Sequence, residues 1–164
     1  MKLFEHSDFE QVILGAVEHF RDRKLRPAII EKDYYVTEAL RIIANTYGEK
    51  VIFKGGTSLV KGWNLIQRFS EDIDIFLDPS AFDPKLNPRA IDRELKKLRD
   101  FVGQHPALTY IEAGGKTIGG FGRNDNFSYK QRFGGVGEVP NRVLVETGTA
   151  SGREPSILVS CARI

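Results

Sequence analysis

The sequence predicts an α+β fold in which a mixed β-sheet is flanked by helices. Up to residue 47, apolar residues recur at the three- and four-residue steps typical of helices. The pattern then changes to short apolar or alternating runs at residues 51–53 and 72–77, which indicate strands. Beyond these, an amphipathic segment at residues 89–102 precedes three strand-like segments separated by glycine-rich stretches.

The composition is typical of a soluble globular protein. Hydrophobic residues make up 41% and charged residues 28% of the 164 residues, which argues against a disordered chain. No apolar run reaches the roughly 18 to 20 residues of a membrane span, and the N-terminus lacks a secretory signal. We expect a cytoplasmic protein with a single domain over residues 1–164, comprising N-terminal helices at about residues 8–47 and a core at about residues 50–164.

The net charge of +2 does not by itself indicate a nucleic-acid partner. Two stretches, residues 21–26 and 89–99, are locally basic and would suit a polyanion. Both are also explained as solvated helix faces.

The N-terminal region predicts two helices. Residues 8–24 form the first, with Asp8 as its N-cap. Pro27 opens the second, which runs to about Tyr47 and is ended by Gly48.

The central region predicts a strand, a turn, a short helix and a second strand. The buried strand at residues 51–53 runs directly into a glycine pair, and a helix is expected at residues 58–65. The strand at residues 72–77 is followed by a proline-rich loop at residues 80–88.

The second half predicts the helix at residues 89–102 and strands at residues 108–113, 127–133 and 143–147. The glycines at 114–115 and 119–122 have no helix after them, so we interpret both groups as hairpin turns.

Asp72 and Asp74 are the first candidate site residues. Residues two apart on a strand point to the same face, so their carboxylates emerge side by side. Two like charges this close repel each other unless a cation lies between them, and oxygen ligands suit Mg²⁺. An isolated Asp-x-Asp is common by chance, so the pair alone is also explained as structural.

Gly55 and Gly56 form the second candidate feature. Without Cβ atoms, the backbone can turn sharply and approach a ligand closely. A helix beginning at Thr57 or Ser58 would direct free N–H groups at an anion, and both hydroxyls could donate to a phosphate. The alternative is a plain strand-turn-helix corner capped by a hydroxyl.

The combination is more specific than either part. A glycine turn followed by a returning strand with two aspartates places a phosphate cradle beside a metal-binding edge, which suits nucleotidyl transfer. The motif is not a Walker A motif, because no Gly-Lys-[Ser/Thr] follows the glycines.

These residues resemble the polymerase-β-like nucleotidyltransferases, which carry Gly-Ser, a spacer and then Asp-x-Asp. Residues 54–62 and 68–74 look specifically like the AbiEii/AbiGii toxin family, which includes MenT-like toxins. Residues 31–37 resemble the helix that precedes its core, and we expect Asp33 and Tyr34 there to serve packing. The resemblance is close over residues 28–78.

The resemblance implies a polymerase-β-like nucleotidyltransferase core that transfers NMP from an NTP to RNA, with Mg²⁺ or Mn²⁺ at Asp72 and Asp74. Some members are toxins of toxin–antitoxin systems that add nucleotides to tRNA 3′ ends, and others are linked to phage defence. The implied partners are an NTP, an RNA such as tRNA and a cognate antitoxin, with no membrane.

The family's third carboxylate maps to Glu146, a charge inside the otherwise apolar strand at residues 143–147, where it would meet a metal, lie at an edge or face water. Lys54 and Lys61 are candidate phosphate contacts. The full nucleotide-binding set expected from the resemblance is Gly55, Gly56, Thr57, Ser58, Lys54, Lys61, Arg68 and Ser70.

The family continues into a mostly helical C-terminal region that is missing from this chain, so the sequence predicts either a fragment or a short member. Two alternatives stay open. The chain could be a truncated, inactive relative that binds antitoxin or RNA, or it could transfer to a protein hydroxyl or a small molecule on the same core.

Overall fold

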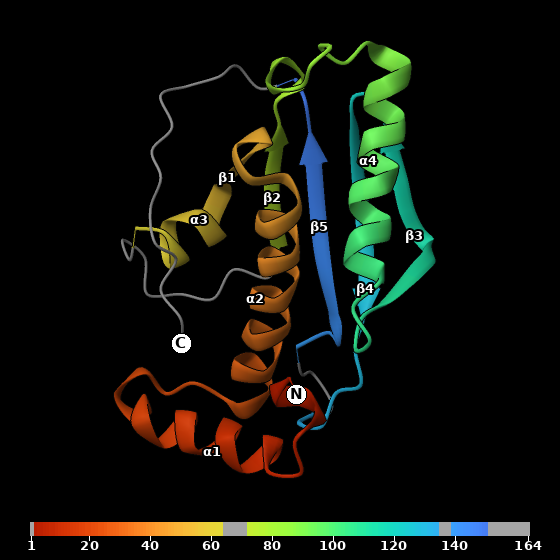
Figure 1. Cartoon of the computed structure of the whole chain (residues 1–164). Helices are drawn as coiled ribbons and strands as arrows, with labels where there is room; N and C mark the ends of the chain where they lie inside the picture. The colour runs from red at the N-terminus through yellow and green to blue at the C-terminus, as the bar shows by residue number, and fades with distance from the viewer. Residues whose placement is uncertain (1, 64–71, 135–138, 151–164) are drawn as a thin grey trace.

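The computed structural model describes residues 2–63, 72–134 and 139–150, which form an α+β fold around one five-stranded sheet (Figure 1). The strands lie in the order β1-β2-β5-β4-β3. Only β2 and β5 pair in parallel, and the other neighbours are antiparallel. The strands are β1 Val51–Lys54, β2 Asp72–Leu77, β3 Thr109–Ile118, β4 Gly122–Ser128 and β5 Arg142–Gly148. The predicted mixed sheet flanked by helices is therefore confirmed.

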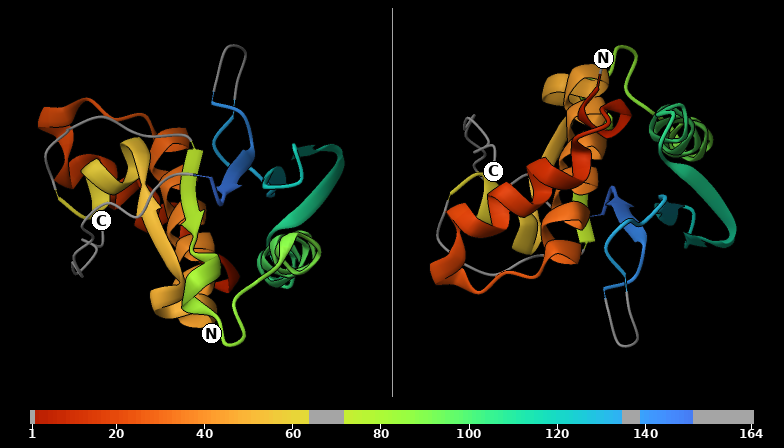
Figure 2. Two further views of the ribbon diagram at one scale, coloured as in Figure 1. Left: turned by 90° about the horizontal axis from the view of Figure 1, so that it is seen from above. Right: turned by 90° about the horizontal axis from the view of Figure 1, so that it is seen from below.

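Two helices lie on the same face of the sheet, as Figures 1 and 2 show. Helix α2 (Pro27–Tyr47) packs on β2 and β5, and helix α4 (Pro88–Gly103) packs on β4 and β3. The strand side chains that face these helices are almost fully buried: Ile73, Ile75, Phe127, Val143 and Val145. Burying such a side chain contributes about 1.5–3 kcal/mol, so this layer fixes the sheet against the helices. The opposite face of the sheet holds the candidate site.

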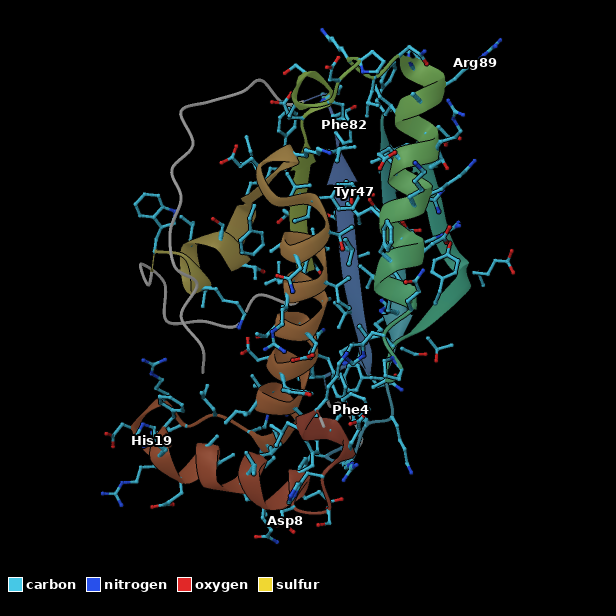
Figure 3. The ribbon with its side chains drawn as sticks, in the orientation of Figure 1. Phe4, Asp8, His19, Tyr47, Phe82 and Arg89 are labelled. Atoms are coloured by element: carbon cyan, nitrogen blue, oxygen red, sulfur yellow. The ribbon has the colours of Figure 1, made fainter. Side chains whose placement is uncertain are left out.

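The short helix α1 (Phe9–His19) packs against the N-terminal part of α2, as expected for the first of two N-terminal helices. Phe9 is fully buried, and its ring centroid lies 5.4 Å from that of Tyr34. Figure 3 places Phe4 beside the N-terminal end of α2 and Tyr47 between the other end of α2 and α4. The Tyr47 hydroxyl lies 3.3 Å from the Glu94 carbonyl and donates to it, which ties α2 to α4.

Two helix predictions needed correction at their ends. The first helix stops at His19 and a 3₁₀ turn at Arg21–Arg23 follows, because the charged residues beyond Phe20 have no apolar surface to bury. Asp8 occupies the N-cap position but makes no side-chain capping bond. The third helix, α3, spans Gly55–Lys61 and not residues 58–65, of which 64 and 65 lie outside the described residues.

The hairpin β3–β4 also differs from the prediction. Gly119 and Gly120 have positive φ and form the expected turn, but Gly114 and Gly115 lie inside β3, at a register irregularity between Ile111 and Lys116. Strand β4 covers Gly122–Ser128 and not residues 127–133. The strand lacks the apolar alternation that marks a strand in the sequence, because two of its buried residues are the charged Arg123 and Asp125. The Arg123 guanidinium pairs with the Asp125 carboxylate at 2.7 and 3.0 Å, which makes their burial possible.

Within the described ranges, none of the helices combines the length and the apolar character that a membrane span requires.

Candidate functional site

Asp72 and Asp74 lie on the sheet face opposite α2 and α4. They alternate along β2 with Ile73 and Ile75, whose side chains are at most 1% exposed, while both aspartates are half-buried. Because β2 is paired on both sides, by β1 and β5, its backbone is held firmly. As predicted, a strand that is held on both sides carries the two carboxylates on one face.

Glu146 joins them from the neighbouring strand. In the parallel register of β2 and β5, Glu146 is the direct partner of Asp74, so the two side chains lie on the same face of the sheet. On its other side, the Asn124 amide of β4 donates a 2.7 Å hydrogen bond to Glu146 Oε1. Three carboxylates from two adjacent strands therefore gather on one face.

The electrostatics of this group favour a bound cation. Burial raises the pKa of Glu146, and the nearby charges of Asp74 and Asp72 raise it further, while the bond from Asn124 opposes the rise. A divalent cation between these carboxylates would relieve the repulsion among them.

The donor set fits a hard divalent metal such as Mg²⁺, since it consists of carboxylate oxygens. In the described part of the chain, no group of three or more His, Cys, Asp or Glu side chains is already arranged to hold a metal. Adjustment of side-chain torsions on a fixed strand frame would be needed to bring Asp72, Asp74 and Glu146 onto one ion.

The glycine turn lies directly against this group. Gly55 has φ +69°, a conformation that favours glycine, and a Cβ at this position would lie 2.7 Å from Asp74 Cγ. The absence of a side chain lets the start of α3 approach the Asp74 carboxylate closely. The two motifs that the sequence separates by 16 residues or more are thus neighbours in space.

Helix α3 is tied to β2 by Thr57. The Thr57 side chain is only 1% exposed, and its hydroxyl donates to the backbone carbonyl of Asp72. Lys54, and not Thr57 or Ser58, occupies the N-cap position. Thr57 is therefore a tether between the turn and the carboxylate strand, and the prediction that it or Ser58 caps the helix is wrong.

Lys61, at the end of α3, is not directed at the turn. Its ammonium lies 2.8 Å from Asp33 Oδ2 and 2.9 Å from Thr37 Oγ1, and both Lys61 and Asp33 are at least 94% buried. Burial raises the pKa of Asp33, whereas the charge and hydrogen bond of Lys61 oppose that rise. This ion pair joins α3 to α2, so the Lys61 charge is already neutralised by Asp33.

The remaining predicted site residues fall into two groups. Lys54 is the direct cross-strand partner of Asp74, and Ser58 is half-buried on the first turn of α3. Arg68 and Ser70 lie outside the described residues.

Sequence reasoning missed two residues of this region. Asn124 lies in a polar stretch without strand periodicity, so nothing marked it as a neighbour of Glu146. Asp33 was expected only to pack its helix. A carboxylate inside the apolar face of a long helix was a signal that it needs a partner.

The site consists of two carboxylates on a rigid strand, a third carboxylate in register with them, and an adjacent glycine turn. This arrangement is consistent with a nucleotidyltransferase-like core. The comparison with protein families agrees: the model of the nucleotidyl transferase AbiEii toxin family, of type IV toxin–antitoxin systems, matches residues 39–159. This match covers more than half of the chain, and the chain belongs to that family of nucleotidyltransferases. No curated protein matches the chain, and no solved structure does.

Proposed function

We propose that this protein transfers a nucleoside monophosphate from an NTP to an RNA acceptor, the 3′ end of a tRNA, as the toxin of a toxin–antitoxin or phage-defence system in the cytoplasm. The observation that carries the proposal is the pairing of Asp74 with Glu146 next to Gly55. This pairing supports the proposal because it brings three carboxylates, whose oxygens suit a divalent metal, beside a turn that suits phosphates.

Asp72, Asp74 and Glu146 would hold Mg²⁺ or Mn²⁺. Such an ion supplies neutralisation of the phosphates and stabilisation of the charge that develops in the displacement. The exposed Gly55 and the backbone of Gly56, with the Ser58 hydroxyl, are assigned to the β- and γ-phosphates.

Glu146 is assigned the role of general base. It lies beside Asp74 in the strand register, and the hydrogen bond that the Asn124 amide donates to its Oε1 fixes its orientation and leaves Oε2 for the acceptor hydroxyl. In the reaction, the acceptor hydroxyl oxygen forms a bond to the α-phosphorus, and the bond from this phosphorus to the β-phosphate oxygen breaks. The hydroxyl proton passes to Glu146, and pyrophosphate leaves.

Lys54 remains assigned to the phosphates because it is the neighbour of Asp74 across β1 and β2. Arg68 and Ser70 stay in the proposed nucleotide-binding set on the resemblance alone. We remove Lys61 from the direct contacts and assign it, with Asp33, to holding α3 in place.

The test is a transfer assay with each of the four α-labelled NTPs, Mg²⁺ and total tRNA. We expect label to move to tRNA with one or more NTPs, and Asp74→Asn to lose that transfer while keeping the wild-type far-UV circular dichroism. Retained transfer by Asp74→Asn would refute the assigned site. Absence of transfer from the folded wild-type protein, with tight binding of RNA or antitoxin, would favour a binding module.

A further inference from the structure

One row of side chains crosses all five strands on the candidate-site face. In the strand register, Lys54 is opposite Asp74, Asp74 is opposite Glu146, Glu146 is opposite Asn124, and Asn124 is opposite Lys116. Directly paired residues point to the same side of a sheet, so this row lies on one face. The two lysines flank the central carboxylates from opposite sides.

The row separates two sides of the site. Neighbouring strands are about 4.8 Å apart, which puts Lys54 one strand spacing from Asp74 and Lys116 about 10 Å beyond Glu146. The glycine turn and α3 occupy the β1 side, next to Asp74. A triphosphate bound there leaves the β4–β3 side of Glu146 for the second substrate.

The β4–β3 side has the chemistry of a surface for a phosphodiester chain. Asn124, Asn126 and Ser128 share the face of Glu146, because β4 residues two apart alternate with the buried Arg123, Asp125 and Phe127. The exposed Lys116 and the exposed Arg142, which begins β5 opposite Ser128, add positive charge on the same face. Glu112 lies in the unpaired stretch of β3, so the register does not place it in this row.

We propose that this surface, formed by Lys116, Asn124, Asn126, Ser128 and Arg142, holds the acceptor strand, a single-stranded RNA end whose backbone phosphates contact Lys116 and Arg142. The acceptor hydroxyl then reaches Glu146 from the side opposite the triphosphate. This inference rests on the proposed function, since it places the second substrate of the same transfer. Lysine and arginine neutralise phosphates without reading sequence, so the contact fixes position and not base identity.

The experiment measures RNA binding without turnover. A 5′-fluorescein tRNA and a labelled single-stranded RNA are titrated with protein by anisotropy at several NaCl concentrations, without NTP. We expect Lys116→Ala to weaken binding of both RNAs and to reduce the slope of log K against log[salt] by about 0.7, the loss of one phosphate contact. A single-stranded DNA of the same sequence should show the same loss of slope.

The matched control is Lys97→Ala. Lys97 is an exposed lysine on α4, on the other face of the sheet and within the basic stretch at residues 89–99. We expect it to bind RNA with the wild-type slope. Equal effects of the two variants, an effect of Lys97→Ala alone, or no RNA binding by the folded wild-type protein would overturn the inference.

The readout also separates the two proposals. In the transfer assay, Lys116→Ala should raise the KM for RNA and leave the KM for the NTP unchanged. If Asp74→Asn retains transfer while Lys116→Ala loses the salt slope, the site assignment fails and the RNA surface stands. If transfer needs Asp74 but Lys116→Ala binds RNA as the wild type does, the site assignment stands and the proposed RNA surface fails.

Discussion

Gly55 lies so close to Asp74 that a methyl group at residue 55 would come within 2.7 Å of the Asp74 carboxyl carbon and 2.9 Å of its Cβ. The contact joins the turn assigned to the phosphates to a carboxylate assigned to the metal. Any change at residue 55 must therefore affect both.

Gly55→Ala should be costly for this reason. The positive φ of +69° alone makes an L-residue unfavourable by about 1–2 kcal/mol, and the new methyl group would push Asp74 aside. We expect a lower free energy of unfolding in urea and a larger loss of transfer activity. Gly15→Ala in α1 is the control, because a Cβ there meets nothing within 4 Å and should stabilise the helix by about 0.5–1 kcal/mol. Equal stability of the two variants would contradict the role of Gly55.

The buried pair of Lys61 and Asp33 predicts a large loss of stability when one partner is removed. Lys61→Met leaves the Asp33 carboxylate buried without its lysine partner, which should lower the free energy of unfolding by about 3–5 kcal/mol. The double variant Lys61→Met/Asp33→Leu removes both charges and should recover most of that loss. Urea unfolding of the wild type and the two variants checks this, and a stable Lys61→Met single variant would show that the pair is dispensable.

His105 predicts a loss of stability on mild acidification. Burial lowers the pKa of His105 below the usual 6.5, and the Glu38 carboxylate, whose Oε2 lies 3.3 Å from Nε2, opposes this lowering without reversing it. The Nδ1 atom accepts a hydrogen bond from the Ala107 N–H, which requires that nitrogen to be unprotonated. Because the unfolded state takes up the proton first, His105 lowers the free energy of unfolding as the pH falls below about 6.5. His105→Gln should weaken this dependence between pH 7.5 and 6, as measured by urea unfolding. An NMR titration giving a His105 pKa above 6.5 would refute the argument.

The carboxylate group predicts stabilisation by a divalent ion. Mn²⁺ at about 100 times its Kd should raise the free energy of unfolding by about 2.7 kcal/mol, since only the folded state gathers Asp72, Asp74 and Glu146. Thermal unfolding with and without Mn²⁺ checks this independently of activity. Asp74→Asn should show little shift, while Lys97→Ala should shift as the wild type does. An undiminished shift in Asp74→Asn would place the ion elsewhere.

The helices and the strand β2 were predictable because local periodicity specifies them. The alternation of Asp72 and Asp74 with Ile73 and Ile75 states which face is buried, and Pro27 and Gly48 mark the ends of α2. Strand β4 could not be located in this way, because the charged Arg123 and Asp125 give its sequence the polar character of a loop. In the fold these two charges are buried and pair with each other.

By itself, the sequence determined the fold class, the family resemblance and the shared face of Asp72 and Asp74, since each depends on residues close together in the chain. The tertiary structure decided which distant residues meet them. The register of β2 with β5 brings Glu146 to Asp74, and the register of β4 adds Asn124. Helix packing turns Lys61 to Asp33. A strand shifted by one residue would turn its side chains to the opposite face, so the site depends on long-range pairing that no local pattern encodes.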